Sequence, residues 1–265
     1  MTGDAMRGDI AERLGDVGVP PAMVRTAVRL IPDDVSGVLV YGSRARSDHL
    51  AESDLDLLGL VEQPRRTVHD GEVGLSFYTV EQLKTGIGSL FGAHLARDAH
   101  ILWDPRGLLA ACIAEMGNVD TERLLERARF FAQVLGSRDH DLPKYRAGLV
   151  REARYLLRSC LYAQSIAEGN PCFSVREIAA LHHDERLVEL LASRPRGEAS
   201  DDDLQECCVR LERIIGPLPP NRHGSLEALV VNEWGVNDEL VAMALLALGG
   251  SNADSDYTEV AKVLL

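Results

Sequence analysis

Compact apolar runs separated by polar turns dominate the N-terminal part of the chain, a pattern typical of short buried strands among helices. Residues 9–31 predict two short helices that break at Val19-Pro20-Pro21. Four later apolar runs predict strands, and a helical stretch at 80–97 lies between the third strand and the fourth. The strands are expected at 38–41, 55–61, 72–78 and 99–103.

From Pro105 onward, helical periodicity replaces the strand pattern. A long helix is expected from Lys144 to Glu168, ended by Gly169-Asn170-Pro171. The pattern therefore predicts an α+β fold, with a small mixed sheet and helices in residues 1–110 and an all-α helical bundle in residues 111–265. The other helices are expected at 108–116, 121–135, 174–181, 184–192, 201–215 and 225–248, with a last short one after the polar segment 251–256.

The composition narrows the class of protein. Of the 265 residues, 46% are hydrophobic and 26% are charged, which is an ordinary globular balance. No apolar run reaches the ~20 residues that cross a bilayer, and the acidic N-terminus lacks the apolar centre of a signal peptide. The five cysteines are odd in number and lack metal-site spacing, so we expect reduced thiols and a cytoplasmic location.

The formal net charge of −13 bears on the partners. Phosphate contacts need a basic surface, so this charge disfavours a nucleic-acid partner. The same charge suits a cationic small molecule, although it also serves solubility. The sequence leaves the oligomeric state open and is compatible with a homodimer.

A candidate phosphate site lies where the first predicted strand ends in Gly42 and Ser43, followed by Arg44 and Arg46. Glycine permits a ligand to approach the backbone closely. Free N–H groups at a helix start attract a phosphate, and the Ser43 hydroxyl adds a donor. These residues predict a site for a phosphorylated ligand.

The second predicted strand carries Asp54 and Asp56 near its start. Residues i and i+2 of a strand point to the same face, where two carboxylates repel unless a cation lies between them. Hard oxygen ligands favour Mg²⁺ or Mn²⁺, which also bridge substrate phosphates. Each pattern alone is common in turns and at strand edges; together they indicate nucleotidyl transfer.

The segment from Gly42-Ser43 to Asp54-Leu55-Asp56 resembles the GS…DxD signature of the DNA polymerase β superfamily. It is most similar to the small bacterial nucleotidyltransferases, which include antibiotic-modifying enzymes and toxin–antitoxin proteins. The resemblance covers residues 36–105, including 89–104, and is loose in the helical part. It implies that Gly42 and Ser43 hold a nucleoside triphosphate, with ATP expected, and that Asp54 and Asp56 ligate the metals.

The same resemblance implies that the products are pyrophosphate and a nucleoside monophosphate ester, with AMP expected, formed on the hydroxyl of a small-molecule acceptor. Modification of a protein hydroxyl is the alternative. Arg44 and Arg46 would reach the phosphates, or stay solvated.

The sequence departs from the superfamily pattern at a third carboxylate, which the resemblance places on the next strand as a metal ligand and base. Gly74 occupies the expected position. Glu72 lies two residues earlier, a shift of ~6.6 Å along a strand, and Asp70 is a weaker candidate. If neither serves, the chain would be an antitoxin-like protein that binds nucleotide without efficient transfer.

On the long predicted helix, Lys144, Arg151 and Arg158 recur at seven-residue spacing, with Arg154 near the same face. They predict a clamp on the triphosphate tail. The alternative is a solvated face balanced by Glu152. The opposite face is expected to be core, with Leu149, Ala153, Leu156, Leu157 and Cys160.

A further pattern in the helical part resembles the Arg-x(4–6)-His element of ribonuclease domains that accompany minimal nucleotidyltransferases. Arg176 is followed by His182 and His183, but the polar residue usual at that site is missing. We expect the two histidines at a helix end, where cations suit the helix dipole.

Overall fold

The computed structural model describes residues 3–49, 53–192 and 199–249. The chain forms two compact units, Met1–Val119 and Asp120–Leu265, and each is described by itself. The boundary that the sequence places between residues 110 and 111 falls inside a helix of the first unit, α6 (Leu108–Ala114). This helix belongs there because its apolar side chains pack in the core of the sheet.

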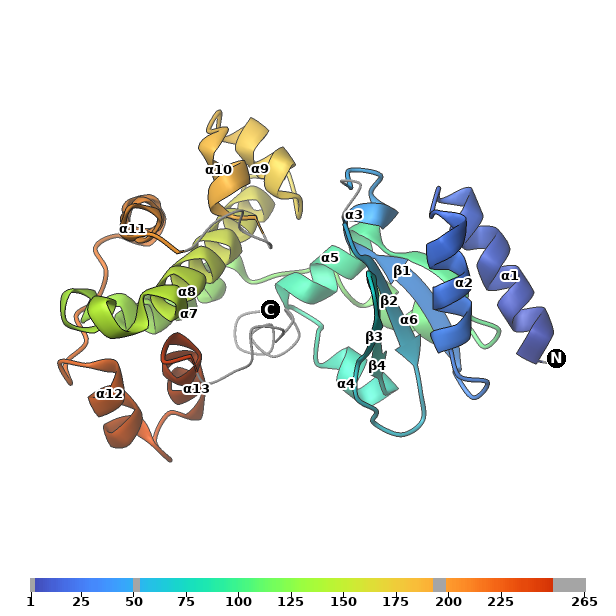
Figure 1. Cartoon of the computed structure of the whole chain (residues 1–265), viewed down its shortest axis with the longest axis horizontal. Coiled ribbons are helices and arrows are strands. Elements are labelled where there is room, and N and C mark those ends of the chain that lie inside the picture. Colours follow the sequence, from blue (N-terminus) through green and yellow to red (C-terminus); the bar gives the residue numbers. More distant parts are fainter. Residues whose placement is uncertain (1–2, 50–52, 193–198, 250–265) are drawn as a thin grey trace. The chain divides into compact units, whose positions relative to one another are not determined.

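The first unit is built on a five-stranded sheet of order β3-β4-β2-β1-β5 (Figure 1). Strands β2 and β4 are parallel, and the other neighbouring pairs are antiparallel. The four predicted strands are confirmed, and a fifth, β3, was missed because its three residues are exposed and lack an apolar run. The strands are β1 (Gly37–Tyr41), β2 (Leu55–Leu60), β3 (Val68–Asp70), β4 (Val73–Tyr78) and β5 (His100–Trp103).

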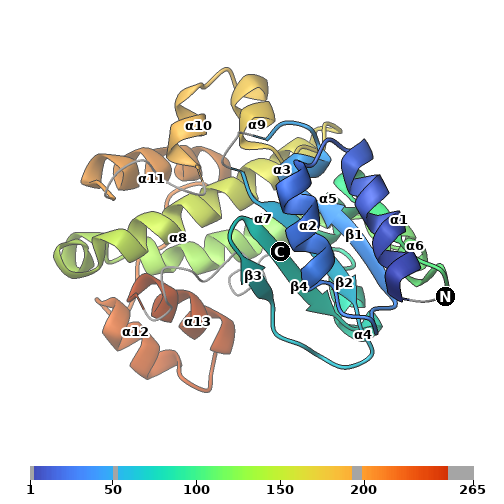
Figure 2. The same cartoon turned by 45° about the vertical axis from the view of Figure 1, so that its right-hand side comes forward.

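Helices cover both faces of this sheet (Figures 1 and 2). On one face α1 (Gly3–Asp16) and α2 (Pro21–Leu30) pack against inward-facing residues such as Leu55 and Leu57. On the other face α4 (Val80–Lys84), α5 (Leu90–Asp98) and α6 pack against residues of opposite parity, such as Leu58 and Leu60. Alternation along β2 thus fixes which face each of its side chains joins.

The helix predicted at 80–97 is in fact two helices, α4 and α5. Gly88, with φ of +79°, turns the chain between them. Each helix then has its own N-cap: Thr79 forms a capping box with Gln82, and the Ser89 hydroxyl accepts from Gly92 N at 3.0 Å. Two caps so close together favour two short helices over one.

The second unit is helical in its described residues and centres on α8 (Arg138–Ala167). This helix is kinked at Tyr145, whose φ of −124° is not helical, two residues after Pro143. The predicted core face of the helix is buried, which confirms that assignment. The other helices are α7 (Thr121–Phe131), α9 (Val175–Leu181), α10 (Arg186–Leu190), α11 (Asp201–Ile215), α12 (Leu226–Glu233) and α13 (Asp238–Ala247), with the 3₁₀ turn Ala132–Leu135.

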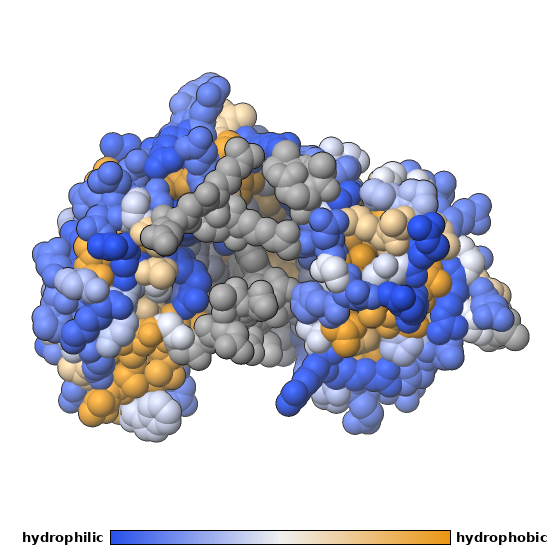
Figure 3. All heavy atoms as spheres, viewed as in Figure 1, coloured by the Kyte–Doolittle hydropathy of each residue, from blue (hydrophilic) through white to orange (hydrophobic). Residues whose placement is uncertain are grey.

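The helix predicted at 225–248 is also divided, into α12 and α13, by Gly235 with φ of +71°. Asn237 then caps α13 by accepting from Leu240 N at 3.0 Å. Around this turn Val231, Trp234 and Val236 are exposed, and Figure 3 shows apolar surface over α12 and α13.

The structure also bears on the predictions for the cysteines, the two histidines and the helix lengths. All five cysteines are buried and unbonded. No helix in the described ranges has the length and apolar character needed to cross a membrane. His182 and His183 follow the last residue of α9, so their predicted place at a helix end is confirmed. The short helix predicted after residue 256 lies outside the described residues.

Candidate active site

The first element of the site is the tight turn after β1. The chain leaves Tyr41 and enters the single-turn helix α3 (Gly42–Ala45) at Gly42, whose φ is +78°. A Cβ added to Gly42 would lie 2.5 Å from the Asp56 carboxylate oxygen Oδ2. Only glycine therefore fits here, both for its backbone conformation and because the Asp56 carboxylate lies against it.

The two predicted metal ligands lie at the start of β2. Asp56 is the second residue of this strand and pairs with Tyr41 of β1 and with Gly74 of β4. Asp54 comes just before the strand, and both aspartates are half-buried. The Asp56 carboxylate thus lies against the backbone of Gly42, and its cross-strand neighbour on β4, Gly74, has no side chain.

Arg44 is buried, with 3% of its surface exposed. Its Nε and Nη2 atoms donate to the carbonyl oxygen of Ser53 at 2.9 and 2.7 Å. This guanidinium therefore holds the backbone that precedes Asp54 against α3. The interaction fixes the distance between the Gly42–Ser43 turn and the first aspartate.

Arg46 joins α3 to α5. Its guanidinium forms ion pairs with Asp48 at 3.3 Å and Asp98 at 3.2 Å, and its Nη1 lies 2.9 Å from Nε2 of His94. Burial, and then the positive charges of Arg46 and Arg97, lower the pKa of His94 to about 3. His94 is therefore neutral and accepts from Arg46.

Aromatic contacts complete this support. The Tyr41 ring meets Phe91 and His94 edge-on, with centroids 6.0 and 6.1 Å apart. His100 places Nε2 3.1 Å from the carbonyl oxygen of Ala45. Sequence reasoning assigned no role to His94, Asp98 or His100; their one signal was the family-like stretch 89–104. Their contacts show that this stretch braces α3.

The region of the expected third carboxylate contains Glu72, Gly74 and His69. Glu72 is exposed in the turn before β4, and its carbonyl oxygen accepts from Leu55 N at 2.8 Å. Gly74 pairs with His69 of β3. A Cβ added to Gly74 would lie 3.1 Å from Cε1 and 3.2 Å from Nδ1 of His69. The imidazole thus lies where a side chain of residue 74 would be.

Asp70 occupies the other face of the sheet. It pairs with Arg29 of α2, the helix that covers the face opposite Asp56. Because successive strand residues alternate in direction, His69 projects to the face of Asp56 while its neighbour Asp70 does not.

The donor set agrees with a substrate-shared divalent ion. In the described ranges, no three His, Cys, Asp or Glu side chains gather as a metal site. Mg²⁺ is commonly held by one or two carboxylates together with substrate phosphates and water. Asp54 and Asp56 would provide that number of hard oxygen ligands, one just before β2 and one at its second residue.

The basic residues predicted on the long helix make contacts within the second unit. Lys144 lies 3.3 Å from Glu227, and Arg151 donates to the carbonyl oxygen of Leu246. Glu152 is fully buried, so it is not the exposed balancing charge that the sequence suggested. Burial raises the pKa of this carboxyl to about 7, against the lowering effect of Arg151.

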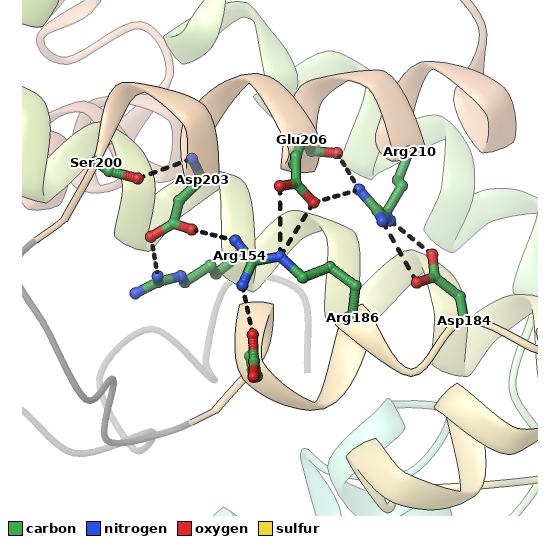
Figure 4. Close-up of polar contacts among 8 residues, drawn as sticks. Arg154, Asp184, Arg186, Ser200, Asp203, Glu206 and Arg210 are labelled. Atoms are coloured by element: carbon green, nitrogen blue, oxygen red, sulfur yellow. Dashed lines mark hydrogen bonds and ion pairs between the residues drawn. The ribbon is translucent and has the colours of Figure 1, made fainter.

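Arg154 belongs to a larger network that joins α8, α10 and α11 (Figure 4). It donates to Asp203 at 2.8 Å, and Asp203 also accepts from Arg186 at 3.0 Å. Glu206 then links Arg186 to Arg210. This charge arrangement ties three helices of the bundle together.

Comparison with known proteins identifies the domain that contains these residues. Residues 23–142 match the family model for the nucleotidyltransferase domain, and the match includes Gly42, Ser43, Asp54 and Asp56. No curated protein matches the chain. The chain therefore contains a nucleotidyltransferase domain of the polymerase β-like kind. More specifically, the protein is a transferase that moves a nucleotidyl group, in a family that generally uses a nucleoside triphosphate and a divalent metal.

Proposed function

We propose that the protein transfers AMP from ATP to a hydroxyl group of a small-molecule acceptor, with two Mg²⁺ or Mn²⁺ ions. The observation that carries this proposal is the Asp56 carboxylate lying against Gly42, since a hard ligand then lies beside the phosphate-binding turn. The ions would neutralise charge on the triphosphate and on the attacking and leaving oxygens.

Each residue has a defined part in the proposal. Asp54 and Asp56 hold the ions. The backbone of Gly42 and the hydroxyl of Ser43 bind the triphosphate, and Arg44 keeps Asp54 in place through the Ser53 carbonyl. The acceptor oxygen bonds to the α-phosphorus, the bond from that phosphorus to the bridging oxygen breaks, and pyrophosphate leaves.

Arg46, Lys144, Arg151 and Glu72 were also candidates from the sequence. Arg46 supports the turn through Asp98, so we assign it positioning rather than direct phosphate binding. For Lys144 and Arg151, a clamp on the triphosphate remains a prediction, which requires that nucleotide compete with their contacts to Glu227 and Leu246. Glu72 remains a candidate base.

The acidic composition guides the choice of acceptor. The net charge is −13, and the carboxylates Asp54, Asp56 and Glu72 lie in or beside the site. Such a field attracts cations, so an amino alcohol with several positive charges, as in the aminoglycoside class, suits it best. A protein hydroxyl is the alternative acceptor.

A second candidate function rests on Gly74. Without a carboxylate at that position, the protein would bind nucleotide in an antitoxin-like role and transfer it poorly. The two candidates share the binding step and differ in turnover.

Calorimetric titration of each of the four ribonucleoside triphosphates, with Mg²⁺, tests the binding step on the wild type and on the Asp54→Ala/Asp56→Ala variant. We expect metal-dependent ATP binding that the double substitution abolishes. Arg29→Ala, which removes an ion pair on the other face of the sheet, is the matched control and should bind normally.

Pyrophosphate release with and without an aminoglycoside-class acceptor then separates the two candidates. Stimulation by the acceptor supports the enzyme. Binding without turnover supports the second candidate, and no binding of any triphosphate to folded wild type would refute both.

A further inference from the structure

We infer that His69 of β3 takes the proton of the acceptor hydroxyl, in place of the carboxylate that residue 74 lacks. This inference rests on the proposed function and adds a catalytic residue to it. It starts from the Gly74–His69 pair, in which the imidazole lies 3.1–3.2 Å from the place of a residue 74 Cβ.

The register of the sheet aligns three residues on one line across three strands. His69 pairs with Gly74, and Gly74 pairs with Asp56. Directly paired residues project to the same face of a sheet. Neighbouring strands are ~4.8 Å apart, so the backbones of His69 and Asp56 are separated by roughly 10 Å, with a residue that has no side chain between them.

The absence of a side chain at residue 74 gives the imidazole access to this space. In the described structure, the atoms within 4 Å of a Gly74 Cβ both belong to the His69 ring. The ring therefore leans over Gly74, on the line that leads to Asp56. A side chain at position 74 would require the ring to shift by a few tenths of an ångström, whereas glycine leaves the ring where it is.

The chemistry of the ring suits the missing role. Histidine is the side chain most often used as a general base. As the acceptor oxygen bonds to the α-phosphorus, its proton passes to an imidazole nitrogen of His69, and pyrophosphate departs with the electron pair of the broken bond. Asp54 and Asp56 remain the metal ligands, in agreement with a site where three ligating side chains do not gather among the described residues.

Glu72 is the competing candidate base, so the variants of the two residues show which one takes the proton. It lies in the turn before β4, outside the paired line of His69, Gly74 and Asp56. Its side chain and that of His69 are both exposed, so substitution of either has a similar, small cost for folding.

The test compares His69→Gln, Glu72→Gln and the double variant His69→Ala/Gly74→Asp in the full chain. Binding of ATP with Mn²⁺ is measured by calorimetry, and turnover by pyrophosphate release with water as the acceptor. We expect His69→Gln to lower turnover by about 10²–10⁴-fold, the usual contribution of a general base, with binding changed by less than about threefold. Glu72→Gln should retain turnover.

The double variant removes the ring and supplies a carboxylate in its place, so we expect it to regain part of the lost turnover. A second readout does not depend on turnover. In an NMR titration with Mn²⁺ and ATP, the ring signal of His69, assigned with His69→Gln, should broaden.

The outcomes are separable. Failure of the wild type to bind ATP with Mn²⁺ would refute the proposed function and this inference with it. Normal binding with turnover retained in His69→Gln, or lost in Glu72→Gln, would refute the inference alone. Normal binding with no turnover in wild type would refute the inference and favour the second candidate function. A His69 signal that does not broaden would also refute the inference, as would a loss of ATP binding in His69→Gln equal to its loss of turnover.

Discussion

Substitution of Gly42 by alanine separates the two reasons for a glycine at the turn that we propose binds phosphate. The first reason is the backbone: a φ of +78° costs a residue with a Cβ about 1–2 kcal/mol. The second is contact: the new Cβ would be 2.5 Å from the Asp56 oxygen Oδ2. That oxygen must retreat by about 1 Å to reach ordinary contact, a displacement that can cost a reaction about 10²-fold.

Gly18 provides a control with the same backbone conformation and no contact. Its φ is also +78°, and a Cβ there would meet nothing within 4 Å. Gly18→Ala and Gly42→Ala should therefore lose similar stability from the backbone, about 1–2 kcal/mol each, measured by chemical denaturation. Gly42→Ala alone should lose metal-dependent ATP binding and pyrophosphate release.

Two results would refute this reasoning. If Gly42→Ala binds ATP with Mg²⁺ as tightly as the wild type, the Asp56 carboxylate does not need its place against the turn. If Gly18→Ala loses binding to the same degree, the effect belongs to the stability of the unit and not to the site. Calorimetry at a temperature where both variants are folded distinguishes these results.

Three further predictions concern stability. The pKa of buried Glu152 is raised from 4.5 to about 7, so this carboxyl ionises in the unfolded chain before it ionises in the folded one as pH rises. The free energy of unfolding of the second unit should therefore fall by at most about 3 kcal/mol between pH 4.5 and 7. Glu152→Gln should remove this fall in hydrogen-exchange measurements on α8. The pKa of His94 is lowered from 6.5 to about 3, so as pH falls this imidazole takes up a proton in the unfolded chain before it does in the folded one. The free energy of unfolding of the first unit should therefore fall below pH 6.5, and His94→Gln should reduce that fall in acid unfolding titrations. Gly148→Ala should strongly destabilise the second unit, because its Cβ would lie 1.8 Å from the Ala247 carbonyl oxygen. Gly8→Ala, where a Cβ on α1 would meet nothing within 4 Å, should instead stabilise the first unit by about 0.5–1 kcal/mol. Thermal unfolding measures both effects.

The sheet was predictable where strands are buried on both sides. β1 and β2 lie between two layers of helices, so nearly every position is apolar and the runs are visible in the sequence. β3 has no such signal, because its residues at the sheet edge are exposed. The divided helices were missed for another reason: Gly88 and Gly235 lie inside otherwise continuous helical patterns, and the pattern does not show that their φ values are positive.

Charges on the long helix show a different limit of sequence reasoning. The spacing places Arg151 and Arg154 on one face of the helix, but it does not show which partners they contact. Arg154 pairs with Asp203 of α11, far along the chain, and Glu152 is buried instead of solvated. Helical periodicity gives the direction of a side chain relative to its own helix; neighbouring helices decide whether that direction leads to solvent.

The site divides along the same line. Gly42 and Ser43 directly follow β1, and Asp54 and Asp56 lie at the start of β2, the next strand, so their order in the chain already carries the pattern. His69 could not be found that way, because β3 has no strand signal and its pairing with Gly74 exists only in the folded sheet.

The sequence signature lacks a carboxylate at Gly74, whereas in the folded sheet the imidazole of His69 lies beside the place that a side chain of residue 74 would take. A Cβ at residue 74 would lie 3.1–3.2 Å from the ring of His69, so the ring would have to shift by a few tenths of an ångström. The double substitution removes this contact while it supplies a carboxylate, which is the reason that we expect it to exchange one base for the other.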